Sequence, residues 1–166
     1  MNLSVPKVVA NGPYLIAVSG SSRGGNIAQF GFSPPQPPEN ANDAALDKFM
    51  TRKFIPQLRE AFIEGGYDAK PDSDSATHDS PLLVIVSGVI YPVEIDYSWD
   101  REVRNIYYAG SGGDVALGAM VALGIQKTKD AVAAASIIKR AVAIACEWDV
   151  YTNPPIIVET QHRKRR

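Results

Sequence analysis

The sequence has few of the residues from which many functional sites are built. One cysteine and two histidines in 166 residues exclude an internal disulfide and leave no spacing that fits a metal site. Cys146 lies in an alanine-rich apolar segment, where a cysteine is expected to be a small buried residue. No apolar run approaches the ~18 residues of a membrane span, and the first residues lack a signal-peptide pattern. We therefore expect a cytoplasmic protein without a metal site or a membrane segment.

The sequence also carries little net charge. Its 17 basic and 18 acidic residues sum to −1, too weak a field to recruit nucleic acid or a membrane. Basic residues gather at the end, so residues 161–166 are expected to be a solvated tail. Hydrophobic residues make up 45% of the chain, which suits one globular domain over residues 1–160.

Hydrophobic periodicity predicts strands and helices in separate runs. The expected strands are 7–10, 14–19, 81–88, 89–96, 103–109 and 154–160. The expected helices are 44–65, interrupted at Pro56, then 113–124 and 128–147; residues 21–32 also have a helical pattern, and 33–42 are a proline-rich loop. This order favours an α+β fold in which two antiparallel sheets stack between outer helix layers.

Two glycine-rich turns follow strand-like runs. The first, in residues 15–25 (LIAVSGSSRGG), resembles the dinucleotide-binding turn of short-chain dehydrogenases, where backbone N–H groups hold a pyrophosphate. A proline-rich segment follows it instead of a second βαβ strand, and the sequence has no Tyr-x-x-x-Lys motif. Nucleotide binding through Gly20–Gly25 is therefore a distant alternative.

The second turn lies in residues 106–119 (IYYAGSGGDVALGA), where four small residues leave room for a close approach. It resembles the Gly-Ser-Gly-Gly turn of proteasome β-subunits and HslV-type peptidases. These are N-terminal-nucleophile (Ntn) hydrolases, which cut amide bonds with the first residue of the mature chain. Residues 7–20 resemble their lysine, hairpin and glycine turn, and residues 144–153 (IACEWDVYTN) resemble the HslV-type segment that ends in Tyr-Thr-Asn.

The resemblance implies a four-layer αββα sandwich and a set of site residues. Lys7 matches the catalytic lysine, which favours deprotonation of the nucleophile. Gly20 lies in the turn whose backbone N–H stabilises the oxyanion. Ser111 matches the serine that assists proton transfer near the N-terminal amine. Glu147 aligns with a supporting aspartate, and Asp149 lies two residues later, so either could serve.

Other implications concern the substrate and the nucleophile. Ser19 and Arg23 fall where the family lines its substrate pocket, and an arginine there favours acidic or polar substrates. The family's nucleophile is a threonine roughly thirty residues before the lysine, but Met1 stands only six positions before Lys7. The sequence therefore lacks the first hairpin and a candidate nucleophile.

Two interpretations follow. Either a longer native N-terminus supplies the threonine, and the protein is a threonine-type peptidase or amidase with a peptide substrate, or it is a non-catalytic structural or assembly subunit. The resemblance implies self-association and no cofactor in both.

Overall fold

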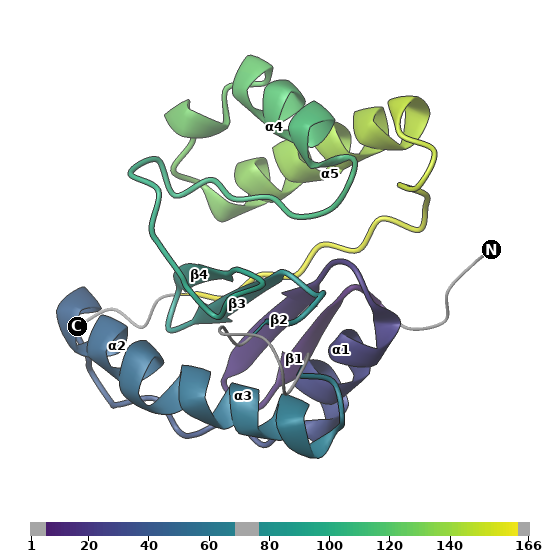
Figure 1. The fold of residues 1–166 in the computed structure, drawn as a ribbon. Coiled ribbons are helices and arrows are strands. Elements are labelled where there is room, and N and C mark those ends of the chain that lie inside the picture. Colours follow the sequence, from purple (N-terminus) through teal and green to yellow (C-terminus); the bar gives the residue numbers. More distant parts are fainter. Residues whose placement is uncertain (1–5, 69–76, 163–166) are drawn as a thin grey trace. The chain divides into compact units, whose positions relative to one another are not determined.

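The computed structural model describes residues 6–68 and 77–162, which form two compact units (Figure 1). The sheet unit comprises residues 7–68, 77–101 and 161–162. The helix-pair unit comprises residues 6 and 102–160. Residues 163–166 of the predicted basic tail lie outside the described residues.

The sheet unit is built on two β-hairpins. Its four antiparallel strands, in the order β1-β2-β3-β4, are β1 (Val8–Asn11), β2 (Tyr14–Val18), β3 (Leu82–Val86) and β4 (Val89–Val93). Positive φ angles form both turns: 57° at Gly12 in the first, and 52° and 73° at Ser87 and Gly88 in the second. Two successive positive φ angles suit the right-handed twist of paired strands. Both predicted hairpins are confirmed.

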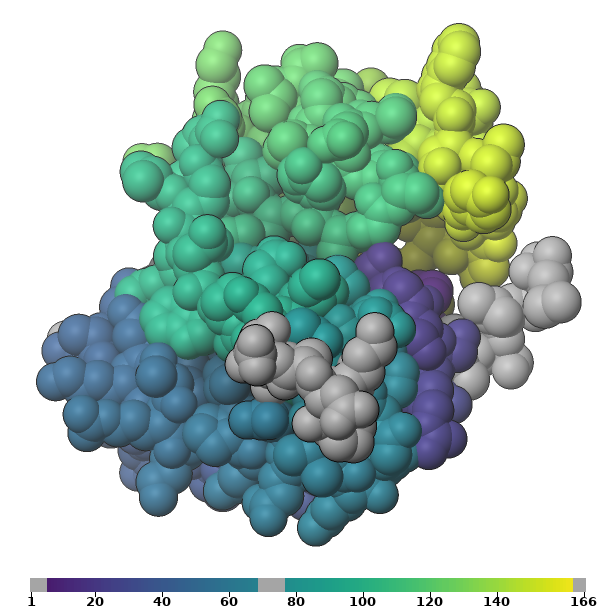
Figure 2. Space-filling model, viewed as in Figure 1, coloured from purple at the N-terminus to yellow at the C-terminus, as the bar shows by residue number. Residues whose placement is uncertain are grey.

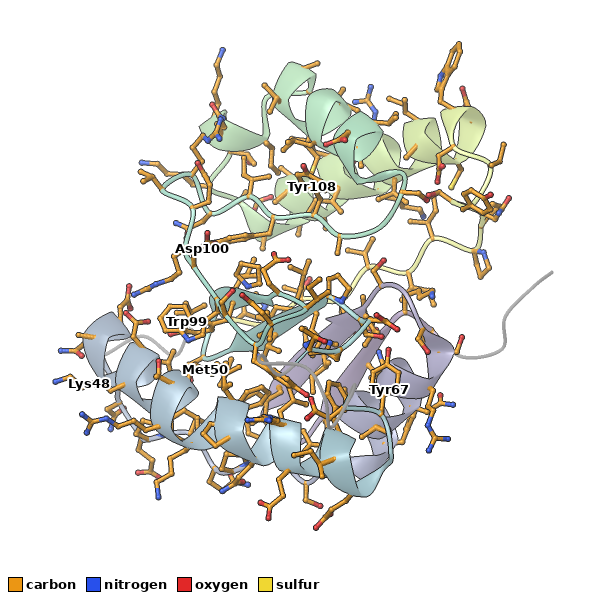
Figure 3. All side chains as sticks on the ribbon, viewed as in Figure 1. Lys48, Met50, Tyr67, Trp99, Asp100 and Tyr108 are labelled. Carbon is orange, nitrogen blue, oxygen red and sulfur yellow. The ribbon has the colours of Figure 1, made fainter. Side chains whose placement is uncertain are left out.

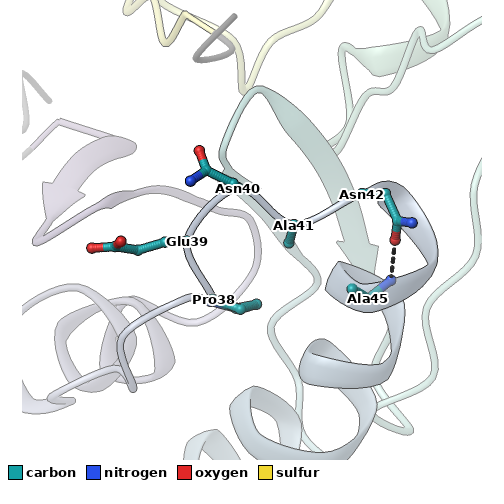
Figure 4. Close-up of a pocket in the computed structure, with 6 residues that line it drawn as sticks. All are labelled: Pro38, Glu39, Asn40, Ala41, Asn42 and Ala45. Atoms are coloured by element: carbon teal, nitrogen blue, oxygen red, sulfur yellow. Dashed lines mark hydrogen bonds between the residues drawn. The ribbon is translucent and has the colours of Figure 1, made fainter. Parts of the chain in front are cut away.

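The helices of this unit all lie in the connection between β2 and β3. The first, α1 (Ser22–Asn26), continues into a π-helical turn over Ile27–Gly31. After the proline-rich loop, α2 (Asp43–Phe49), a π-helical turn (Met50–Phe54) and α3 (Ile55–Glu64) form one helical run. The run begins where the Asn42 side chain accepts a 2.9 Å hydrogen bond from the Ala45 amide (Figure 4).

The interruption predicted at Pro56 takes the form of the π-helical turn that precedes it. Proline lacks a backbone N–H and its ring crowds the preceding turn, so an ordinary α-helical geometry there is costly. Pro56 lies in the first turn of α3, where the missing N–H is tolerated.

One face of the sheet and one stripe of the helical run make the core. The buried residues alternate along β2 and β3, and in β4 Pro92 is buried as well. The buried strand residues of the core are Tyr14, Ile16, Val18, Leu82, Val84, Val86, Val89, Tyr91 and Val93. The buried helix residues recur every fourth position: Leu46, Met50, Phe54, Leu58 and Phe62. Met50 points to the sheet and Lys48 away from it (Figure 3), and the outer side of the run forms the blue surface in Figure 2.

The helix-pair unit consists of two helices with small contacting residues. They are α4 (Gly113–Ala122) and α5 (Ala131–Trp148), joined by a 3-10 turn over Ile125–Lys127. Ala116 and Met120 of α4 and Ala141 and Ala145 of α5 are buried. Both predicted helices are confirmed. None of the described helices is both long and apolar enough to cross a lipid bilayer.

Two predicted strands, 103–109 and 154–160, are absent. In the described residues of the helix-pair unit, no segment forms a strand, and these two stretches are irregular. After β4 along the chain, Trp99 makes an isolated bridge with Val93. A β-rich sequence forms a strand only where a neighbouring strand satisfies its N–H and C=O groups. The prediction is wrong here because no such neighbour is present among the described residues.

Phe54 offers a direct test of the core. It is fully buried, and its ring lies 5.0 Å from Tyr14 and 5.5 Å from Phe32, centroid to centroid. We expect Phe54→Ala to lower the free energy of unfolding by about 3–5 kcal/mol, because it leaves a cavity at this contact. Phe30→Ala is the control, since Phe30 is 60% exposed, and should change it by no more than ~0.5 kcal/mol. Urea unfolding measures both; equal effects would contradict this core.

Candidate active site

The turn after β2 contains Gly20, for which the resemblance predicts a backbone donor role. Gly20 has a φ of +83°, and a Cβ atom there would lie 2.2 Å from the carbonyl oxygen of Asp79, so only glycine fits. The Ser19 N–H donates to the Pro81 carbonyl at 3.0 Å. Within residues 6–68 and 77–162, the Gly20 N–H has no acceptor.

Lys7 lies just before β1, and its backbone is firmly held. Its carbonyl accepts hydrogen bonds from the Val18 N–H at 3.0 Å and from the Gln29 side chain at 2.9 Å. Gln29 is 6% exposed and also donates to the Ile16 carbonyl at 3.0 Å. Lys7 itself is exposed, and among the described residues no ion pair involves its ammonium group.

Gln29 is a residue that sequence reasoning missed. Gln29 is a polar residue at a buried position of the π-helical turn. The sequence pattern does not distinguish such a position from an exposed one.

Arg23 and Ser19, the predicted pocket residues, are near neighbours of the Gly20 turn. The Arg23 guanidinium donates to the Gly65 carbonyl, which satisfies the C-terminal end of α3. Ser19 is half-buried, and its N–H extends the pairing of β2 with β3. Their part in substrate binding stays a prediction.

In the helix-pair unit, the Gly-Ser-Gly-Gly turn and the end of α5 come together. The Asp149 carboxylate accepts hydrogen bonds from the Ser111 hydroxyl at 2.7 Å and from the Thr152 hydroxyl at 2.5 Å. A Cβ atom on Gly112 would lie 2.4 Å from the Thr152 Oγ1 and 3.2 Å from the Asp149 Oδ2. Gly112 thus makes room for the close approach that the sequence predicts for this turn.

These hydrogen bonds set the charge of the cluster. Donation from Thr152, and then from Ser111, holds the pKa of the Asp149 carboxyl below its usual range. The carboxylate is therefore ionised at neutral pH. Because the Ser111 hydrogen is directed to Asp149, the lone pairs of the Ser111 oxygen stay open to accept a proton or a hydrogen bond from a third group.

The structure brings Ser111 together with Asp149 and not with Glu147. Glu147 is exposed in the last turn of α5, and within the described part of the chain it makes no hydrogen bond to Ser111. Thr152 completes the cluster although sequence reasoning did not select it. Its signal is its position three residues after Asp149, beyond the end of α5.

The next feature to consider is whether the described side chains could hold a metal ion. Among residues 6–68 and 77–162, no group of three His, Cys, Asp or Glu side chains could hold a metal ion. An open pocket of about 780 Å³ lies between Pro38 and Ala45 and contains none of the candidate site residues (Figure 4).

The comparisons with known proteins rest on structure. Two structures of Thiobacillus denitrificans BPH are similar to this chain. One, in complex with epoxomicin, has a TM-score of 0.67 and 22% identity, covering 92% of this chain and 76% of that one. The other has a TM-score of 0.65 and 22% identity, covering 90% and 75%. Eukaryotic HslV from Trypanosoma brucei has a TM-score of 0.50 and 21% identity, covering 89% and 75%.

The chain has the proteasome/HslV-type Ntn-hydrolase fold. This confirms the resemblance drawn from the two glycine turns. No family model matches the sequence, and no curated protein matches it significantly.

The topology gives the dinucleotide alternative no support. A dinucleotide-binding turn joins a strand to a helix within a parallel βαβ unit. Here β2 pairs antiparallel with both of its neighbours, and α1 is only five residues long.

The Gly20 turn can be tested by substitution. We expect Gly20→Ala to lower the free energy of unfolding by about 2–3 kcal/mol, because alanine is strained at positive φ and its Cβ would strike the Asp79 carbonyl. Gly118→Ala is the control. Gly118 lies inside α4 with open space around it, so alanine should be neutral or stabilise by up to ~1 kcal/mol. A Gly20→Ala protein as stable as the parent would refute this account of the turn.

The Asp149 cluster can be tested by titration. Carboxyl ¹³C NMR should give Asp149 a pKa below the ordinary ~3.9, and Thr152→Val should raise it more than Ser111→Ala does. Because folding depresses this pKa, the associated stability is present above the ordinary value and is lost as the pH falls through the folded one. Ser136→Ala, a change at an exposed serine of α5, is the control and should leave the pKa unchanged. An Asp149 pKa unaffected by both cluster variants would contradict the hydrogen bonds.

Proposed function

We propose that the chain is the main part of a threonine-type peptidase or amidase whose nucleophile comes from a segment upstream of Met1. The observation that carries the proposal is the 2.7 Å hydrogen bond between Ser111 and Asp149, which are 38 residues apart. The resemblance predicts for one site Ser111 and a carboxylate that is either Glu147 or Asp149, and the chain has the HslV-type fold of that family.

In this proposal each residue has a chemical role. The threonine hydroxyl attacks the scissile carbonyl, and the Lys7 ammonium favours its deprotonation. The Gly20 N–H stabilises the oxyanion of the tetrahedral intermediate. Ser111, oriented by Asp149, accepts a hydrogen bond from the N-terminal amine and assists proton transfer at that amine. No metal or cofactor takes part.

The same proposal extends to the architecture. We infer one domain over residues 1–160 with the four-layer αββα arrangement, in which the upstream segment contributes the first hairpin. The support is that residues 103–109 and 154–160 have strand-like sequences but no partner strand among the described residues. A hairpin paired with them would complete a second sheet.

Substrate preference and assembly complete the proposal. Ser19 and Arg23 line the pocket before the cut, and the Arg23 charge favours acidic or polar side chains. The protein self-associates, which would cover the apolar residues that lie exposed around the end of α5: Trp148 (77%), Val150 (80%) and Tyr151 (82%).

The decisive experiment expresses the gene with its upstream coding sequence. Intact mass and N-terminal sequencing should find a mature chain that begins with threonine roughly thirty residues before Lys7. Since epoxomicin is bound in one BPH structure, epoxomicin should also bind the processed protein and inhibit its peptide hydrolysis. Light scattering on the same sample should show an oligomer. A chain that begins at Met1 and hydrolyses no peptide would favour the alternative, a non-catalytic structural or assembly subunit.

Variants of the processed protein test the assigned roles. Lys7→Ala and Asp149→Asn should each lower kcat for peptide hydrolysis by about 100-fold or more, as loss of a proton-transfer group does. Lys48→Ala is the matched lysine control, because Lys48 points away from the core of the sheet unit (Figure 3), and should retain full activity. Full activity of Lys7→Ala would remove Lys7 from the mechanism.

A further inference from the structure

Residues 79–81, which lead into β3, pack against the Gly20 turn and hydrogen-bond to it. Their backbone fixes the Ser19 N–H and blocks any side chain at Gly20. Their one buried side chain, Ser80, donates from its hydroxyl to the Ser21 carbonyl at 3.2 Å. The residues on both sides of Gly20 are therefore tied to this one short segment.

Ser80 is the centre of a small chain of hydrogen bonds. Its Oγ lies 2.7 Å from the Tyr67 hydroxyl. Because the single Ser80 hydrogen goes to the Ser21 carbonyl, Tyr67 is the donor of this second bond. A Cβ atom on Gly24 would lie 2.5 Å from the Ser80 Oγ and 2.6 Å from the Tyr67 ring, so α1 approaches the pair closely. Figure 3 labels Tyr67, which follows the end of α3.

His78 lies directly behind Ser80. Its Nδ1 accepts a hydrogen bond of 3.3 Å from the Ser80 N–H. The imidazole is 1% exposed and is packed between aromatic rings, with centroids 5.1 Å from Phe62 and 4.6 Å from Tyr97. Since Nδ1 accepts, the neutral ring carries its proton on Nε2, which has no hydrogen-bond partner among the described residues.

The surroundings favour the neutral form of His78. Burial lowers the pKa of the imidazole, while the Glu94 backbone, the Asp68 and Asp79 carboxylates and the Ser80 backbone act in the opposite direction without overcoming it. Asp68 is itself engaged, since it accepts a 2.6 Å hydrogen bond from Tyr97. The titratable and charged groups around the ring come from α3 and the turn after it (Arg59, Tyr67, Asp68), from Asp79, and from the segment after β4 (Glu94, Asp96, Tyr97).

We propose that His78, acting through Ser80, is a positioning residue for the Gly20 turn, and that protonation of its imidazole releases the turn. A proton on Nδ1 would face the Ser80 N–H, so two donors would meet and Ser80 would move. Its hydroxyl would then leave the Ser21 carbonyl, and the Gly20 N–H would lose its fixed direction. The catalytic meaning of this coupling rests on the proposed function, but the coupling itself rests only on the contacts above.

A pH titration of the ¹⁵N-labelled full chain by NMR tests the proposal. Between pH 8 and pH 5, the amide signals of Gly20, Ser21 and Ser80 should shift together with the His78 ring proton. They should share one midpoint, below the ordinary histidine value of 6.5.

Two variants distinguish the role of the His78 Nδ1 acceptor from the role of ring packing. His78→Asn places an amide oxygen near the Nδ1 position and does not titrate, so the Gly20 signal should keep its high-pH position throughout. His78→Phe keeps the packed ring without the acceptor, so the signal should take the low-pH position at every pH. His162→Asn removes the other histidine, which is exposed, and should leave the wild-type titration unchanged.

The outcomes distinguish this inference from the proposed function. The inference is overturned if the Gly20 amide shift does not change as His78 titrates and is the same in the Asn and Phe variants. This holds even if peptide hydrolysis is found. A coupled titration in a chain that hydrolyses nothing supports the inference and counts only against the proposed function. In an active enzyme, kcat should decrease as the pH is lowered through the midpoint shared by these signals. The His78→Asn variant should not show this decrease.

Discussion

The pairing of β2 with β3 is the constraint on which the rest of the sheet unit depends. It joins two local hairpins across the whole helical connection, with Val18 opposite Leu82 at one end. That register brings residues 79–81 against the Gly20 turn. At the same end, the Val18 N–H holds the Lys7 carbonyl. Lys7 and Gly20, the two candidate catalytic residues of this unit, are therefore placed by the end of one strand.

Local features of the fold were predictable from the sequence, and non-local ones were not. The Asn11-Gly12 turn predicts its hairpin because the turn chemistry lies within two residues. A strand at 103–109 is different, because its stability depends on a partner that no local pattern contains. The π-helical turn before Pro56 lies between these cases. The buried stripe from Leu46 to Phe62 repeats every four residues rather than 3.6, and a wider turn keeps such a stripe facing the sheet.

The candidate site divides in the same way. Ser111 was predictable because the small residues around it form a recognisable turn. The choice between Glu147 and Asp149 was not, because it depends on where α5 ends. The helix ends at Trp148, and Asp149 begins a turn in which its carbonyl accepts from the Thr152 N–H at 3.2 Å. This turn directs the Asp149 carboxylate to Ser111, while Glu147 stays on the exposed surface of the helix.

A buried histidine needs a physical explanation. We explain His78 by its hydrogen bond to Ser80, which holds the Gly20 turn. Among the described residues His78 Nε2 has no partner, which costs roughly 1–3 kcal/mol, and an aromatic hydrocarbon could fill the same space without that cost. A backbone donor stabilises an oxyanion only if its direction is fixed before the reaction. Glycine, the most flexible residue, cannot fix its own direction, so the rigidity has to come from its neighbours. In the coupling that we propose, the hydrogen bond from the Ser80 N–H to His78 supplies this rigidity, and only while the imidazole is neutral.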